Sequence, residues 1–416
     1  MSNSEPGRPD DPLAPSPPAA PPPFPQEPVA PPAPPAFAPQ VLFAAPASHD
    51  VPTSSALTSS AAQVDVPPLN SPPLDDEVAV AEILPPSAAE LAAAMERLPA
   101  RIRAVQTEVA KTVVGQEAVV EAALYALLSR GHCLLVGVPG LAKTLLVQAL
   151  ARVMHLSFKR VQFTPDLMPA DITGTTILRQ TPDGDRQFTF VKGPIFTQLL
   201  LADEINRTPP KTQAALLEAM QEKTVTAGGK SFALDEPFFV LATQNPIEQE
   251  ATYPLPEAQL DRFLFELHVD YPSLEHERQI VSQHSYTPLK NLKTILGRDE
   301  ILLFREAISH VPAPPNVVDY SVRLARATRP NDPSAPAYVK RWIRWGASPR
   351  ASQNMILAGR ARAACMGRFN VSCDDVAALA PLVLRHRILR TFHAEAEGKD
   401  ADAIVRQLLQ DVPRAV

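Results

Sequence analysis

The sequence has few cysteines, few aromatic residues and no long apolar run. Its three cysteines, Cys133, Cys365 and Cys373, are an odd number without metal-site spacing, which is typical of a reducing compartment. No window approaches the roughly 20 apolar residues that span a bilayer. The N-terminus also lacks a basic start followed by an apolar stretch. We therefore expect a cytoplasmic location and no membrane segment.

Basic residues are almost absent from the first 90 positions, where Arg8 stands against eleven Asp and Glu residues. The whole chain has a net charge of −6, so the remaining residues are slightly basic. That excess is too small to indicate nucleic-acid binding, which depends on a clustered basic surface.

Proline, in contrast, is abundant at the same end. About half of the 47 prolines precede residue 91, mixed with alanine and serine. A segment of this composition cannot bury enough apolar surface to offset the entropy of ordering. We predict that residues 1–90 form a disordered acidic segment with polyproline-like stretches, which acts as a tether.

From about residue 97 the pattern becomes that of a folded α/β domain. Short apolar runs predict buried strands at His132–Val136, Leu199–Leu201 and Phe238–Ala242. Helical patterns lie between these runs, and this alternation favours a parallel sheet with helices on both faces. We place this core at residues 97–271.

Two hairpins and a helical region complete the predicted architecture. The hairpins are expected near residues 176–191 and 224–234, where short β-like runs flank turn sequences with glycine. After about Tyr271 helical patterns replace strands. Residues 272–416 are therefore predicted to form a separate, all-helical domain.

The first chemical motif is a loop between a predicted strand and a predicted helix. It consists of Gly137, Val138, Pro139, Gly140, Leu141, Ala142, Lys143 and Thr144. The backbone N–H groups of such a loop bind the phosphates of ATP at a helix N-terminus. Lys143 would reach the β- and γ-phosphates, and the Thr144 hydroxyl would bind Mg²⁺. Ala142 replaces the second glycine of the strict pattern, so we expect a negative φ there. The alternative is a tight turn that ends in Lys-Thr by coincidence.

Two adjacent carboxylates, Asp203 and Glu204, follow the second apolar run. Open α/β sheets bind ligands at the carboxyl ends of their strands, so these groups and the loop can meet at one site. Asp203 would hold the metal, mostly through water, and Glu204 would polarise the attacking water. Alone, an Asp-Glu pair could simply stabilise a helix N-terminus.

Asn245 ends the third apolar run and could hold the lytic water or a γ-phosphate oxygen. Its alternative use is to cap the turn before Pro246, which is a common use of asparagine.

Arginines are needed because negative charge spreads over the γ-phosphoryl oxygens in the transition state. Arg262 and Arg350 are the two candidates. Arg262 could instead pair with Glu257 or Asp261, and Arg350 could be a solvated arginine of its helix.

Together these motifs resemble the MoxR family of AAA+ ATPases over about residues 97–395. The matching segments lie at 114–117, 137–144, 193–196, 202–207, 242–246, 255–263, 346–350 and 384–387. Loops of this family commonly carry alanine before the lysine. The resemblance implies that Asn245 is sensor 1, Arg350 is sensor 2 and Arg262 is an arginine finger. It also places Val114 and Gly115 in the adenine pocket.

The resemblance further implies a ring, usually a hexamer, in which an arginine of one subunit reaches the ATP of its neighbour. It points to a chaperone-like ATPase that remodels or matures a client complex, often with a partner that carries a von Willebrand factor A domain. Two alternatives remain. The hairpins could grip nucleic acid in a motor, although the weak net charge argues against this, or the chain could be a metal-chelatase subunit.

Overall fold

The structure is a computed structural model that describes residues 85–180, 186–227, 229–247, 252–282 and 288–414. All of them belong to one unit of the chain, Val80–Val416. The predicted disorder of residues 1–84 lies outside the described residues.

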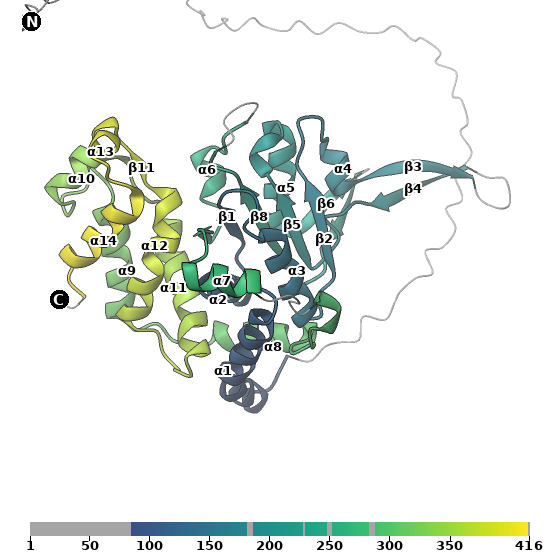
Figure 1. Ribbon diagram of the computed structural model, residues 1–416, viewed down its shortest axis with the longest axis horizontal. Helices are drawn as coiled ribbons and strands as arrows, with labels where there is room; N and C mark the ends of the chain where they lie inside the picture. Colours follow the sequence, from purple (N-terminus) through teal and green to yellow (C-terminus); the bar gives the residue numbers. More distant parts are fainter. Residues whose placement is uncertain (1–84, 181–185, 228, 248–251, 283–287, 415–416) are drawn as a thin grey trace, which may run out of the picture. The chain divides into compact units, whose positions relative to one another are not determined.

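Five parallel strands form the central sheet in the spatial order β2-β5-β8-β1-β9 (Figure 1). Their bounds are Cys133–Val136 for β1, Phe158–Gln162 for β2, Leu199–Asp203 for β5, Phe239–Gln244 for β8 and Phe265–His268 for β9. The predicted α/β class and parallel sheet are confirmed, and β2 and β9 are two further strands at its edges. Because β5, β8 and β1 are neighbours, their carboxyl ends lie side by side.

Both faces of this sheet are buried. Successive side chains of a strand point to opposite faces, so Cys133 and Leu135 of β1 join one apolar cluster and Leu134 joins another. The first cluster includes helices α1 (Ala88–Ala110), α2 (Glu117–Leu128) and α3 (Lys143–Val153). The second includes α4 (Pro169–Thr173) and α5 (Pro210–Glu222). This double burial explains why the strands are nearly continuous apolar runs.

Helix α1 begins at Ala88, inside the segment predicted to be disordered and before the predicted domain start at residue 97. Ser87 and Glu90 form a capping box, in which the backbone N–H of Ser87 donates to Glu90 Oε2 at 2.8 Å. The sequence pattern hides this start because Pro85 and Pro86 continue the proline-rich tract and Pro99 lies within the helix.

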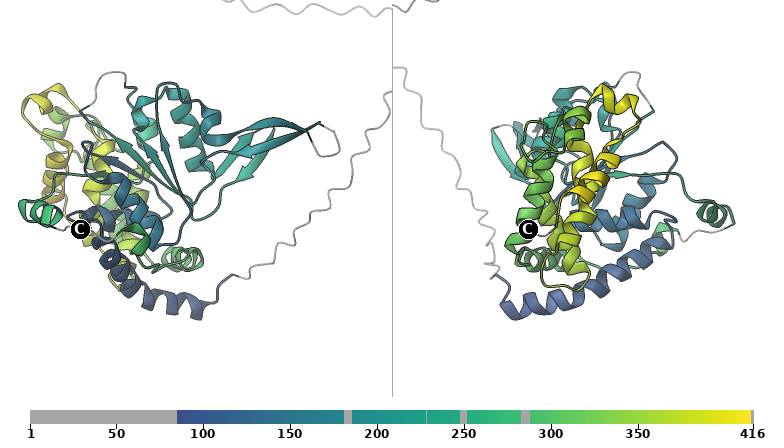
Figure 2. Two further views of the ribbon diagram at one scale, coloured as in Figure 1. Left: turned by 45° about the vertical axis from the view of Figure 1, so that its right-hand side comes forward. Right: turned by 90° about the vertical axis from the view of Figure 1, so that its left-hand side faces the viewer.

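Two antiparallel hairpins extend from the core, as predicted. Their strands are β3 (Gly174–Gln180), β4 (Arg186–Lys192), β6 (Thr224–Ala227) and β7 (Lys230–Ala233). The β3–β4 hairpin projects well away from the sheet in Figure 1 and in the left view of Figure 2. Phe190 of β4 stacks on Phe232 of β7 with ring centroids 4.3 Å apart. The two hairpins are therefore joined by an aromatic contact at their bases.

The C-terminal region is mainly helical. Its helices are α7 (Leu274–Ser282), α8 (Arg298–Ser309), α9 (Pro315–Ala327), α10 (Ala337–Trp342), α11 (Pro349–Cys365), α12 (Cys373–Leu384), α13 (Phe392–Ala396) and α14 (Ala401–Asp411). The prediction of an all-helical domain is wrong in one respect, because β10 (Ile343–Trp345) pairs antiparallel with β11 (Leu389–Arg390). Strands this short carry too few residues for their alternation to be recognised.

Helix α8 ties this region to the core. Arg305 of α8 is buried, and its Nε donates to the backbone carbonyl of Leu127 in α2 at 2.9 Å. Glu300 of α8 pairs with Arg101 of α1 at 2.6 Å.

None of the helices in the described ranges has the length and apolar character needed to cross a membrane.

Candidate active site

The loop at residues 137–144 connects β1 to α3, in the context that phosphate binding requires. Gly137 permits a close approach to the end of β9, since a Cβ there would lie 2.5 Å from the carbonyl oxygen of Val269. Lys143 is the first residue of α3, and its Nζ donates to the carbonyls of Gly137 and Val138, the latter at 3.2 Å. The ammonium group thus lies against the loop that would hold the phosphates.

The prediction that Ala142 has a negative φ is wrong. Its φ is 55° and its ψ is 23°, which is the left-handed conformation. A residue with a Cβ pays about 1–2 kcal/mol to adopt it. The loop path therefore requires the conformation that glycine usually supplies here, and alanine adopts it under strain.

Asp203 is the last residue of β5, and two side chains hold its carboxylate through three donor atoms. Thr243 Oγ1 of β8 donates to Oδ1 at 2.5 Å, while Arg160 of β2 donates to Oδ2 from Nε at 2.9 Å and from Nη2 at 2.6 Å. Neighbouring strands thus supply the partners of Asp203.

Glu204 directly follows β5 and has a positive φ of 57°. Its Oε2 accepts from Gln162 Nε2 at 2.6 Å and from Arg207 Nη1 at 2.7 Å. Its backbone N–H donates to Thr243 Oγ1 at 2.8 Å. Strained backbone at a carboxylate position is a common feature of catalytic sites.

Asn245 follows β8 and is 5% exposed. Its Oδ1 accepts from the backbone N–H of Ile247 at 3.2 Å, so the turn-capping alternative is realised. Its Nδ2 is buried and has no hydrogen-bond partner within the described residues. The amide therefore caps a turn with one atom and retains a free donor at the other.

One pocket of about 540 Å³ brings most of the predicted residues together. Its lining consists of Pro139, Gly140, Leu141, Ala142, Lys143, Thr144, Leu145, Gln148, Arg160, Asp203, Glu204, Thr243 and Asn245. The phosphate loop, the two carboxylates and the amide of Asn245 thus lie in one site.

A second pocket, of about 300 Å³, shares Gly140, Leu141, Ala142 and Leu145 with the first. Its other lining residues are Thr112, Val113, Val114, Gly115, Gln116, Asp270, Pro272 and Ile280. This mainly apolar cavity contains both residues expected to contact adenine. A nucleotide could therefore place its base on one side of the loop and its phosphates on the other.

The donor set of the first pocket fits a nucleotide with Mg²⁺. A hydroxyl and a carboxylate, from Thr144 and Asp203, are oxygen ligands of the kind that Mg²⁺ prefers, and phosphates and water normally complete its shell. The unpartnered Nδ2 of Asn245 is a donor suited to a phosphate oxygen or water.

Arg262 and Arg350 are not among the residues that line either pocket. Arg262 follows α6 (Glu257–Leu260), and its side chain makes no hydrogen bond or ion pair in the described part of the chain. The alternative pairings of Arg262 are thus not observed. Arg350 is the second residue of α11, and its Nη1 lies 3.9 Å from Asp261 Oδ2, with the side chain 42% exposed.

Four residues that contact the carboxylates of the site were not predicted from the sequence: Arg160, Gln162, Arg207 and Thr243. Arg207 lies three residues after Glu204, a spacing that could have suggested the contact. The two β2 residues could be found only once β2 was known to pair with β5, where Gln162 stands opposite Asp203.

The family comparisons agree with this geometry. Residues 132–265 match the ATPase family associated with various cellular activities (AAA), and residues 337–408 match the AAA lid domain. A crystal structure from Cytophaga hutchinsonii, assigned as an ATPase, superposes with a TM-score of 0.71 at 41% identity, covering 78% of this chain and 98% of that chain.

The chain matches three relatives over most of the length of each of them. The chain is 47% identical over 329 residues to Chaperone MoxR1 of Mycobacterium tuberculosis, covering 79% of this chain and 85% of that protein. It is 43% identical to YeaC of Bacillus subtilis, covering 73% and 91%. It is 30% identical to MoxR of Methylorubrum extorquens, covering 74% and 93%. With its phosphate loop and acidic strand end in one pocket, the chain belongs to the MoxR family of AAA+ ATPases and is itself an ATPase.

Proposed function

We propose that this ATPase remodels or matures a client protein complex, as a chaperone-like ring that works with a partner carrying a von Willebrand factor A domain. One observation carries the proposal: a pocket lined by the phosphate loop and the two carboxylates lies in a chain whose relative from Mycobacterium tuberculosis is named a chaperone. Hydrolysis of ATP in the pocket would provide the energy, and the name of the relative suggests that this energy is used to remodel proteins.

The residues of the pocket would divide the work of hydrolysis. Lys143 would bind the β- and γ-phosphates, and Thr144 and Asp203 would hold Mg²⁺, which offsets phosphate charge when bound. Glu204 would orient and polarise the attacking water, and Asn245 would donate from Nδ2 to that water or to a phosphate oxygen. Before this, Glu204 must exchange its contacts with neighbouring side chains for water.

The proposed ring rests on the positions of the two candidate arginines. A positioned guanidinium offsets the charge of the transition state, yet neither Arg262 nor Arg350 lines its own pocket. We therefore propose that Arg262 acts in the site of the next subunit, through a head-to-tail contact that closes by rotation, as in a hexamer. Arg350 would act as sensor 2, since its 3.9 Å contact with Asp261 is loose and partly exposed.

A cytoplasmic location and a boundary near residue 271 complete the proposal. The three thiols are free, as expected in a reducing compartment. Strands of the central sheet end at His268, and the C-terminal helices would move as a lid over the nucleotide.

A nucleic-acid motor is the second candidate, favoured by one feature of the β3–β4 hairpin. Its described residues include Arg179, Arg186 and Lys192, together with Phe188, which is 74% exposed. Basic and aromatic side chains of this kind bind single strands. Stimulation of the ATPase by DNA with a steep salt dependence would favour the motor.

A trapping experiment tests the chaperone proposal. Replacing Glu204 by glutamine should lower kcat about 10²–10⁴-fold, because the group that polarises water is lost, while ATP still binds. The Glu204→Gln ring, incubated with ATP and a cell extract, should retain the client complex and the von Willebrand factor A partner.

The matched control is Lys143→Ala, which should not bind ATP and should not retain the same proteins. Recovery of an identical set with both variants, or of nucleic acid alone, would contradict the proposal.

Mixed rings test the action of Arg262 in the neighbouring site. Arg262→Ala subunits have an intact pocket, and Glu204→Gln subunits have an intact arginine, so their mixture should hydrolyse ATP faster than either variant. Equal rates at every mixing ratio would show that Arg262 acts in its own subunit.

A further inference from the structure

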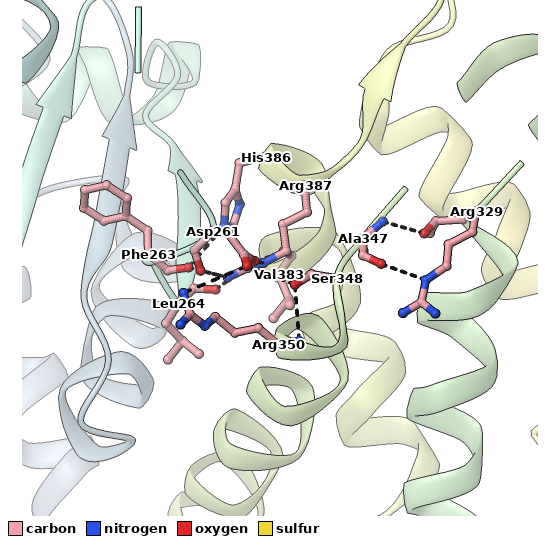
Figure 3. A network of polar contacts seen from close by, with 11 residues as sticks. Asp261, Phe263, Leu264, Arg329, Ala347, Ser348, Arg350, Val383, His386 and Arg387 are labelled. Carbon is pink, nitrogen blue, oxygen red and sulfur yellow. Dashed lines mark hydrogen bonds and ion pairs between the residues drawn. The ribbon is translucent and has the colours of Figure 1, made fainter. Parts of the chain in front are cut away.

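Arg387 connects the C-terminal helices to the segment that carries Arg262 (Figure 3). It lies in the 3₁₀ turn Arg385–Arg387 after α12, with 2% of its side chain exposed. Its Nε donates to Asp261 Oδ1 at 2.6 Å. Its Nη2 donates to the backbone carbonyls of Asp261 at 2.9 Å and Phe263 at 2.6 Å. One guanidinium thus holds the residues on both sides of Arg262.

The other oxygen of Asp261 faces α11. Ser348 Oγ donates to Asp261 Oδ2 at 2.9 Å, and the same hydroxyl caps α11 by accepting from the backbone N–H of Arg350. Ala347, next to Ser348, is fixed in turn, because its carbonyl accepts from Arg329 Nε at 2.9 Å. Figure 3 shows the contacts around Asp261 and, to one side of them, those between Ala347 and Arg329. Asp261 is therefore held from two separate parts of the C-terminal region.

Electrostatic contacts hold the turn with His386 and Arg387 against Asp261. Burial and the adjacent charge of Arg387 lower the pKa of His386 well below its ordinary value, so the neutral ring can lie against the guanidinium. Asp261 is the carboxylate that pairs with Arg387. Arg387 is buried while Asp261 is partly exposed, so removal of the carboxylate would leave the buried guanidinium without its charge partner, which is costly. The turn and the Asp261–Phe263 backbone therefore move together.

Arg262 itself is the one member of this segment whose side chain has no polar partner in the described part of the chain. Its backbone is held on both sides while its guanidinium is left available. This is the arrangement expected of a group that must be presented accurately to something outside its own subunit.

We propose that Arg387 is a positioning residue for Arg262, and that the C-terminal helices of one subunit thereby set the rate of ATP hydrolysis in the next. The inference rests on the proposed ring, in which Arg262 acts in the neighbouring site. It adds the residues through which the two subunits would be coupled. Arg350 and Arg387 both contact Asp261. When the C-terminal helices move in response to the nucleotide of their own subunit, they would therefore shift the residue next to Arg262.

Replacement of Arg387 by methionine tests the proposal in uniform rings. Methionine keeps much of the side-chain volume and removes every donor. We expect kcat to fall at least about tenfold, while the dissociation constant for ATP changes less than about twofold, because the pocket of the same subunit is untouched.

Arg385→Met is the matched control. Arg385 lies in the same turn, is 10% exposed and pairs with Asp402 at 3.0 Å, away from the Asp261–Phe263 segment. Its kcat should stay within about twofold of the wild type. Equal losses in both variants would assign Arg387 a merely structural role.

Mixed rings provide the decisive readout. Arg387→Met subunits should be rescued by Glu204→Gln subunits, because the latter supply a well-placed Arg262 to an intact pocket. Rescue of Arg262→Ala by the same partner is measured in parallel. If that control is rescued and Arg387→Met is not, the ring proposal stands and the positioning role is wrong. If neither is rescued, the action of Arg262 in the neighbouring site fails first.

A second variant guards against loss of folding. Arg387→Lys keeps the charge but cannot reproduce the planar fork of donors. It should give an intermediate kcat, with ring size and melting temperature close to those of the wild type. A folded Arg387→Lys ring with unchanged kcat would overturn the proposal.

Discussion

Acid sensitivity of the core is predicted from His132, which lies immediately before β1 and is 6% exposed. Its Nδ1 accepts from the backbone N–H of Val240 at 3.0 Å, and its Nε2 lies 3.2 Å from the carbonyl of Met220. Only the neutral ring with its proton on Nε2 satisfies both contacts. Burial is the main cause that lowers the pKa of His132 from 6.5 to about 4.

The sign and size of the effect follow from linkage. Between pH 6.5 and about 4 the unfolded chain binds a proton on His132 that the folded chain does not. The free energy of unfolding therefore falls as the pH falls through this window, by about 1.4 kcal/mol per pH unit. Over the whole window the loss is about 3 kcal/mol.

Urea unfolding of the full chain at about pH 7, 6 and 5 measures this loss. His132→Gln keeps a donor and an acceptor but does not titrate. We expect the wild type to lose about 2 kcal/mol more than the variant between pH 7 and pH 5. His386, also buried and neutral, is present in both chains, so its contribution cancels. Parallel pH profiles for the two proteins would refute the reasoning.

Two substitutions in the phosphate loop should have opposite outcomes. Gly137→Ala places a Cβ 2.5 Å from the carbonyl oxygen of Val269. The loop must therefore shift, and we expect a loss of about 1–3 kcal/mol in stability with much weaker binding of a fluorescent ATP analogue; unchanged melting and binding would contradict this. Ala142→Gly removes a left-handed strain of about 1–2 kcal/mol and adds about 0.5–1 kcal/mol of unfolded-chain entropy. Its melting temperature should stay equal or rise slightly with ATPase activity kept, and a clear fall would show that the strain argument is wrong.

The central strands and the loop could be predicted because their signals are local. The apolar run before Asp203 is buried on both faces, so hydrophobicity alone identifies it. Edge strand β2 lacks this signal, because Lys159 and Arg160 are exposed. The start of α1 was hidden by proline, although the capping box of Ser87 with Glu90 was present in the sequence.

The partners of the site residues could not be predicted, because they depend on strand order. Arg160 reaches Asp203 only because β2 pairs with β5, and Thr243 reaches it from the other side because β8 pairs there as well. The left-handed Ala142 is a different case. Residue type indicated a negative φ, but the path of the loop between β1 and α3 determined the conformation.

The stacked Phe190 and Phe232 have a mechanical consequence. In sequence, the carboxylate pair Asp203 and Glu204 lies between the two hairpins, and the aromatic stack closes this stretch into a loop. A pull on either hairpin is therefore carried to both ends of the segment that bears the carboxylates. If the proposed ring acts on a client through these hairpins, a load on either hairpin would reach the carboxylates of the nucleotide site, and the rate of ATP hydrolysis would depend on that load.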